Sequence, residues 1–203
     1  MTLMTRTDDE YWILDPEEVQ CLASAPRMTI VDRLAADGPM SVDDLARVIG
    51  MKQTAVYHHI HKLVAVGLVR ASERRLLPGA RKPQILYATP APRMRMAAAL
   101  GRNELRHGVV RCAGAVLRQA DRDFAEGFSF DPIHDGPYRN HGFLHLIGRP
   151  NLEKLEKINA HLAAIHELLW QPDDQDGRPI ALSWAMAPVS DDTNPKSKEG
   201  TLR

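Results

Sequence analysis

Histidines are the residues of this chain whose spacing comes closest to that of a metal site. His58, His59 and His61 are close together, and His141 and His145 are four residues apart, which is ligand spacing on a helix. On a helix, His58 and His61 would share a face while His59 points elsewhere. The stretch around His141 has the pattern of a strand, and no nearby acidic residue or cysteine completes a ligand set. We therefore expect no metal site.

Other motifs of enzyme chemistry are missing from the sequence. It contains no glycine-rich phosphate loop, no Gly-x-Ser-x-Gly elbow and no complete metal triad. Its two cysteines, Cys21 and Cys112, are too few for a disulfide framework. Cys112 lies among small residues and is interpreted as a packed apolar side chain rather than a redox switch. The sequence therefore predicts a protein that is not an enzyme and has no cofactor.

The distribution of charge gives a second chemical signal. Lys and Arg number 26, as do Asp and Glu, so the formal net charge is zero. Residues 41–95, however, contain ten basic and three acidic residues, which is what a phosphate-binding surface requires. No apolar run approaches the roughly 18 residues of a membrane span, and the N-terminus lacks the pattern of a secretory signal. We expect a cytoplasmic protein that does not bind a membrane.

Helices separated by tight turns are predicted around this basic segment. Residues 1–13 are expected to form a loose leader. Asp15 and Pro16 begin the first helix, and a second runs over residues 26–37. Ser41 and Asp44 have the spacing of a capping box at the start of a third helix, which Gly50 ends.

A fourth helix is expected from about residue 53 to residue 66, followed by a hairpin. Its apolar stripe consists of Val56, Ile60, Leu63 and Val66. Strands over 68–71 and 84–89 then form a hairpin with a basic loop. This order of elements is typical of a winged helix-turn-helix.

The buried stripe leaves the other face of the fourth helix free to enter a DNA major groove, which is about 12 Å wide. Glutamine can bond adenine through two hydrogen bonds, threonine can contact bases, and lysine and arginine can bind phosphates. The residues predicted to contact DNA are Lys52, Gln53, Thr54, Tyr57, His58, His61, Lys62, Arg74, Arg75, Arg81 and Lys82.

These residues resemble the ArsR-type winged-helix repressors over roughly residues 18–90. The stretch from His59 to Val69 is similar to the family's ending His-Leu-x-x-Leu-x-x-Ala-Gly-Leu-Val, with Ile60 for the first leucine and Val66 for the alanine. The resemblance implies a homodimer that binds a pseudo-palindromic operator, usually as a repressor. Lys52 stands where the family often has a serine cap. The Cys-x-Cys pair of its metal-sensing members is absent.

The C-terminal half is expected to make the dimer. A long helical pattern covers residues 92–126. A further helix beginning after Asn151 is flanked by strand-like stretches at 143–147 and 179–187, and aromatic residues gather in this half. A stripe of mostly small residues on the long helix is predicted to lie at the dimer interface, namely Gly101, Leu105, Gly108, Cys112 and Ala115.

The sequence thus predicts a mainly α protein with a small β-hairpin wing. It divides into a winged helix-turn-helix DNA-binding domain (14–90), a long dimerisation helix (91–127), a small α+β C-terminal region (128–188) and a disordered tail (189–203). The predicted function is a homodimeric transcriptional regulator, a repressor, that binds specific double-stranded DNA. An effector bound by the C-terminal region is left open. The alternatives are a winged-helix module that binds proteins and a metal-responsive sensor that uses histidines.

Overall fold

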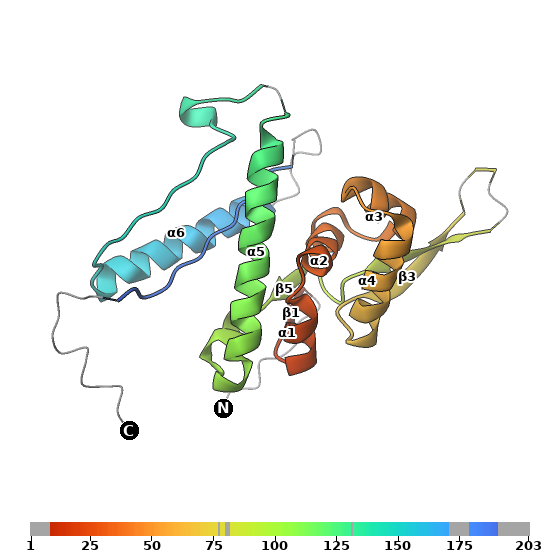
Figure 1. The fold of residues 1–203 in the computed structure, drawn as a ribbon, viewed down its shortest axis with the longest axis horizontal. Coiled ribbons are helices and arrows are strands. Elements are labelled where there is room, and N and C mark those ends of the chain that lie inside the picture. Colours follow the sequence, from red (N-terminus) through yellow and green to blue (C-terminus); the bar gives the residue numbers. More distant parts are fainter. Residues whose placement is uncertain (1–8, 77, 80–81, 131, 171–178, 191–203) are drawn as a thin grey trace.

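Four helices and a small sheet make up the N-terminal half of the chain (Figure 1). The structure is a computed structural model that describes residues 9–76, 78–79, 82–130, 132–170 and 179–190. The helices of this half are α1 (Pro16–Leu22), α2 (Ala25–Asp37), α3 (Val42–Val48) and α4 (Gln53–Ala65). All four predicted helices are confirmed, with boundaries that differ from the predicted ones by one or two residues.

Capping side chains determine where α1 and α3 begin. The Asp15 side chain accepts a hydrogen bond from the Glu17 N–H, and Glu18 completes a capping box at the start of α1. Ser41 and Asp44 form the predicted capping box of α3. Each box satisfies backbone N–H groups that have no partner within the first turn of a helix. The short helices therefore have defined starts although neither exceeds two turns.

The sheet of this half has the strand order β2-β4-β3, with both pairings antiparallel. Its strands are β2 (Met40–Ser41), β3 (Arg70–Arg75) and β4 (Gln84–Ala88). The β3–β4 hairpin extends away from the helices as a wing (Figure 1). Arg74 and Arg75, which were expected in the hairpin loop, instead lie on β3, because the strand continues beyond Ala71 after an irregularity in its register.

The hydrophobic core lies between α4 and the other N-terminal helices. Val56, Ile60 and Leu63 are buried, so three members of the predicted stripe are confirmed, while Val66 is only half-buried. They belong to one cluster with Ile30 of α2 and Leu45 of α3. Burial of these side chains fixes the rotation of α4 about its axis, and with it the face that α4 presents to solvent.

A second, two-stranded sheet was not predicted. β1 (Glu10–Trp12) pairs in parallel with β5 (Arg93–Arg95), and Arg95 forms an ion pair of 2.8 Å with Glu10. The prediction that residues 1–13 form a loose leader is therefore wrong for residues 9–13. The two parallel strands have only three residues each and lie far apart in the sequence. Their pattern is therefore too short for the pairing to be predicted.

The long helix α5 (Arg106–Gly127) is shorter than the predicted helix over 92–126. Residues 93–105 instead form β5 and two 3-10 helices, Ala97–Gly101 and Asn103–Leu105. Gly101 lies in the first of these and is exposed. The pairing of β5 with β1 and the short 3-10 turns replace the first part of the expected helix.

The small-residue stripe of α5 packs inside its own chain, against α1 and α2. Leu105, Cys112 and Ala115 are buried, and the Cys112 Sγ donates to the Val19 carbonyl oxygen at 3.3 Å. A Cβ on Gly108 would lie 2.7 Å from the Val19 Cγ1. Leu105, Gly108, Cys112 and Ala115 are therefore taken up by packing within the chain, which lets α5 approach α1 closely. The predicted place of the exposed Gly101 at a dimer interface stays a prediction.

The C-terminal region consists of α6 (Leu152–Trp170) flanked by extended chain. The strands expected at 143–147 and 179–187 do not form. A period-two apolar pattern becomes a strand only beside a partner strand, and the described part of the chain offers none. Most of the expected tail (191–203) lies outside the described residues.

An ion pair and aromatic contacts attach the C-terminal region to the rest of the chain. Arg93 forms hydrogen bonds of 3.0 and 2.8 Å with Glu167 of α6. The His141 ring lies 4.3 Å from Phe124 and 4.2 Å from Phe128, measured between ring centroids. Large apolar side chains remain exposed here, with Phe143 at 88% and Trp184 at 56%.

Among the described helices, α5 and α6 included, none has the length and apolarity to cross a membrane.

Gly108→Ala should destabilise the protein, because the new Cβ would overlap the stiff Val19 side chain. Overpacking costs about 1–3 kcal/mol and outweighs the gain in helix propensity of about 1 kcal/mol. Gly114→Ala is the control, since its Cβ would meet only the flexible end of Arg118 at 3.3 Å, and it should stabilise slightly. Urea unfolding measures both. Equal effects of the two substitutions would contradict the close packing of α5 on α1.

Candidate nucleic-acid interface

One face of α4 carries the predicted DNA-contacting side chains. All seven predicted residues of this region are exposed, and they are Lys52, Gln53, Thr54, Tyr57, His58, His61 and Lys62. Tyr57 is 48% exposed, and its ring stacks on His61 with centroids 6.4 Å apart. The structure therefore brings these side chains together on one polar surface that contains several hydrogen-bonding groups.

A tight turn between α3 and α4 positions this surface. Gly50 adopts a φ of +65°, a conformation that glycine reaches without steric cost. The Met51 N–H donates to the Ala46 carbonyl oxygen at 3.0 Å and closes the turn. As predicted, Lys52 precedes α4 without forming a side-chain cap. N–H groups at the start of α4 are consequently left without a capping side chain and are suited to phosphate oxygens.

His59 lies between the exposed face and the core. It is half-buried, and its Nδ1 has no hydrogen-bond partner in the described part of the chain. Burial lowers the pKa of His59, and the positive charges of Arg27 and Lys62 add to the effect. His59 is therefore a packing residue that favours its neutral form. Over the described ranges, no three His, Cys, Asp or Glu side chains gather to hold a metal ion.

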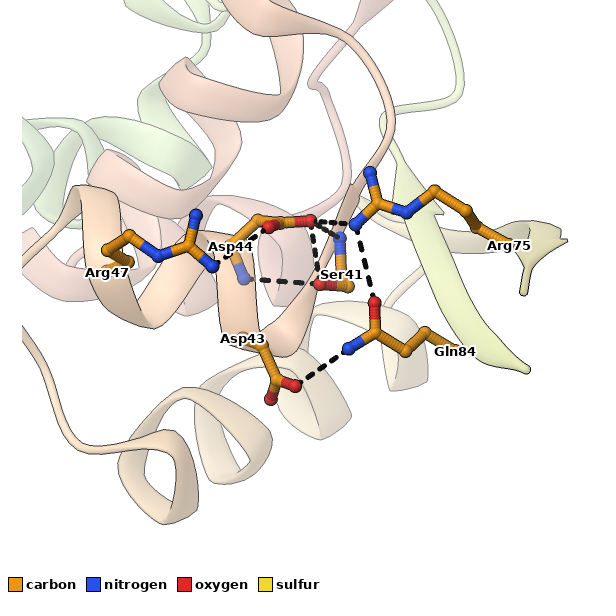
Figure 2. Close-up of polar contacts among 6 residues, drawn as sticks. All are labelled: Ser41, Asp43, Asp44, Arg47, Arg75 and Gln84. Atoms are coloured by element: carbon orange, nitrogen blue, oxygen red, sulfur yellow. Dashed lines mark hydrogen bonds and ion pairs between the residues drawn. The ribbon is translucent and has the colours of Figure 1, made fainter. Parts of the chain in front are cut away.

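The wing adds basic side chains beside α4. Arg74 and Lys82 are exposed, whereas Arg81, also predicted to contact DNA, lies outside the described residues. Arg75 is engaged within the protein, where its Nη2 lies 2.5 Å from the Asp44 Oδ2 and 3.3 Å from the Gln84 Oε1 (Figure 2). Arg75 thus differs from the exposed residues predicted to contact DNA, because its side chain is already bonded within the protein.

The start of α3 contributes polar residues that the sequence analysis did not select for a role at this site. Asp43 accepts a hydrogen bond of 2.8 Å from the Gln84 Nε2, and Arg47 lies 3.4 Å from the Asp44 Oδ1 (Figure 2). The capping pattern identified Asp44, but its contact with the wing spans 31 residues and has no local signal.

Asp44 has an unusual electrostatic environment. Partial burial would raise the pKa of its carboxyl group, but hydrogen bonds from Ser41 and Arg75 outweigh that effect and hold the pKa below its usual value. The carboxylate therefore remains charged at any pH at which DNA binding would be measured, and the ion pair with Arg75 persists with it.

Comparison with known proteins gives a match in this region. A family model described as a helix-turn-helix domain matches residues 22–71, which include α2, α3 and α4. Residues 22–71 form a helix-turn-helix domain. The HTH-type transcriptional regulator NmtR of Mycobacterium tuberculosis is 45% identical to this chain over 51 residues. That alignment covers 25% of this chain and 42% of the relative, so the chain spans less than half of that protein's length.

Three solved structures of regulators also match. NMB1585, a MarR family regulator from Neisseria meningitidis, is 13% identical, with a TM-score of 0.27 over 71% of this chain and 74% of that one. An apo mutant of Lactococcus lactis ZitR is 16% identical, with a TM-score of 0.28 over 72% and 83%. The regulator Tm0710 from Thermotoga maritima is 14% identical, with a TM-score of 0.29 over 71% and 74%. TM-scores this low do not establish a shared overall fold.

The predicted helix-turn-helix is confirmed over residues 22–71, which match the family model. The second helix of the motif is α4, because α3 and α4 enclose the turn at Gly50, and α4 exposes the polar face. The hairpin of β3 and β4 follows α4 directly, as a wing should.

His59 should make the protein less stable as the pH drops. Because its pKa is lower in the folded state, the unfolded state binds the proton first as the pH falls below about 6.5. His59→Leu and His59→Gln should both weaken the dependence of the free energy of unfolding on pH between 7 and 5, measured by urea titration. Only His59→Leu should also stabilise the protein at pH 7. An unchanged pH dependence in both variants would show that burial does not lower the pKa of His59.

Proposed function

We propose that this chain is a cytoplasmic transcriptional regulator, without enzymatic activity, that binds specific double-stranded DNA. The observation that carries the proposal is a set of exposed polar and basic side chains, six on α4 and Lys52 just before it, beside the exposed Arg74 and Lys82 of the wing. Side chains of these types can hydrogen-bond base edges or bind phosphates. The match of the helix-turn-helix domain to a known transcriptional regulator supports the same function.

A homodimer is the proposed active form, acting as a repressor on a pseudo-palindromic operator. Its interface is assigned to the exposed face of α5 and to α6, since the small-residue stripe is occupied within the chain. Val110 is 65% exposed, Leu117 is 51% exposed and Leu168 of α6 is 70% exposed. Exposed apolar surface on neighbouring long helices is typical of protein interfaces. Two recognition helices roughly 34 Å apart could then enter successive major grooves.

Gln53→Ala and Tyr57→Ala should reduce the preference of the protein for DNA from upstream of its own gene over random duplex. Each change removes a candidate base contact, and a lost contact of this kind costs about 1–3 kcal/mol of discrimination. Titrations at two salt concentrations, with the mass of the complex determined by sedimentation, measure specificity and stoichiometry together.

Matched controls come from exposed residues away from α4. Gln20→Ala on α1 and Tyr138→Ala in the short 3-10 helix Gly136–Tyr138 remove the same side-chain types and should leave specificity unchanged. Arg81→Ala should weaken binding to all duplexes and flatten the salt dependence. Equal binding of upstream and random DNA by the wild-type protein, with both lost as salt rises, would contradict a sequence-specific function.

A further inference from the structure

Both strands of the wing are connected to the start of α3 through side chains (Figure 2). Arg75 of β3 binds Asp44, and Gln84 of β4 donates to Asp43. Arg75 and Gln84 are also direct partners across the hairpin, and the Arg75 Nη2 donates to the Gln84 Oε1 at 3.3 Å. These four side chains form a continuous network, the α3–wing brace, at the last paired residues before the hairpin loop.

Hydrogen bonds between Ser41 and Asp44 hold the acidic end of the α3–wing brace in place independently of Arg75. The Ser41 Oγ donates to the Asp44 Oδ2 at 2.8 Å, and the Asp44 N–H donates back to the Ser41 Oγ at 3.1 Å. The Asp44 side chain is only 20% exposed. Moving the Arg75 guanidinium to a DNA phosphate would leave this partly buried carboxylate without its nearest positively charged partner, which is unfavourable.

Adjacent residues of a strand point to opposite faces, so Arg74 and Arg75 have different surroundings. Arg75 is directed to α3, while Arg74 is exposed and has no ion pair in the described part of the chain. An isolated two-stranded hairpin is marginally stable, so contacts of its strands with α3 decide where it lies. The angle of the wing relative to α4 in turn decides whether both elements can contact the same duplex.

We propose that Arg75 and Gln84 are positioning residues, which fix the wing against α3, and that the wing binds phosphates through its other basic side chains, Arg74 among them. The inference rests on the proposed DNA-binding function. It corrects the expectation that Arg75 contacts DNA and gives a role to Asp43 and Gln84, which the sequence analysis did not select.

Arg75→Lys separates positioning from phosphate binding. Lysine keeps the positive charge that a phosphate contact needs, but its single ammonium group cannot reproduce the planar guanidinium that bridges Asp44 and Gln84. Hydrogen exchange of the free protein should show faster exchange of the β3 and β4 amides in Arg75→Lys and in Gln84→Ala. Arg74→Lys is the matched control on the neighbouring residue and should exchange like the wild type.

Binding to a random-sequence duplex of 30 base pairs provides the second measurement. Arg75→Lys and Gln84→Ala should each lower the affinity several-fold, although neither removes a positive charge, and the double variant should be little weaker than either single one. Arg74→Ala should lower the affinity additively with Gln84→Ala and reduce the slope of log K against log salt by about 0.9.

The brace would be contradicted if Arg75→Lys had the same amide exchange in β3 and β4 and the same duplex affinity as the wild-type protein. Arg75 would then again be expected to contact phosphate. Absence of duplex binding by the wild-type protein would instead overturn the proposed function. The two failures are distinguishable, because hydrogen exchange is measured without DNA.

Discussion

Burial of the apolar stripe of α4 is the constraint on which the rest of the interface depends. With Val56, Ile60 and Leu63 buried in the core, α4 has a single rotational setting. The same setting places its polar side chains on the outer face and leaves His59 at the boundary between the two. If the apolar stripe were shifted by one residue, α4 would turn about its axis and bury part of its polar face. Stability and the proposed recognition of DNA therefore depend on the same helix.

The acidic residues at the start of α3 connect this helix to the basic wing. Asp44 serves at once as the capping-box partner of Ser41 and as the partner of Arg75, so the start of α3 and the loop-proximal end of the wing strands share one carboxylate. Consecutive acids in the first turn also suit the positive end of the helix dipole. A capping-box residue of α3 thereby also contacts the wing that follows α4.

Local patterns predicted the parts of the fold that local physics determines. Capping residues located the starts of α1 and α3, and the stripe of α4 located the recognition face. The pairing of β1 with β5 and the contact between Arg75 and Asp44 join residues far apart in the chain, and no local pattern records them. The stripe of α5 was detected but assigned to the wrong partner, because small residues indicate close packing without indicating which helix packs there.

Mapping amide chemical shifts of the isotope-labelled protein during titration with duplex DNA tests most directly whether α4 and the wing form the DNA-binding surface. The account predicts that the amides that shift first and furthest lie at the start of α4, around Gln53 and Tyr57, and on the wing at Arg74. Signals of α6 should change little unless dimer formation is linked to binding, which a dilution series without DNA would reveal. Shifts concentrated on α6, with α4 and the wing unaffected, would contradict the account.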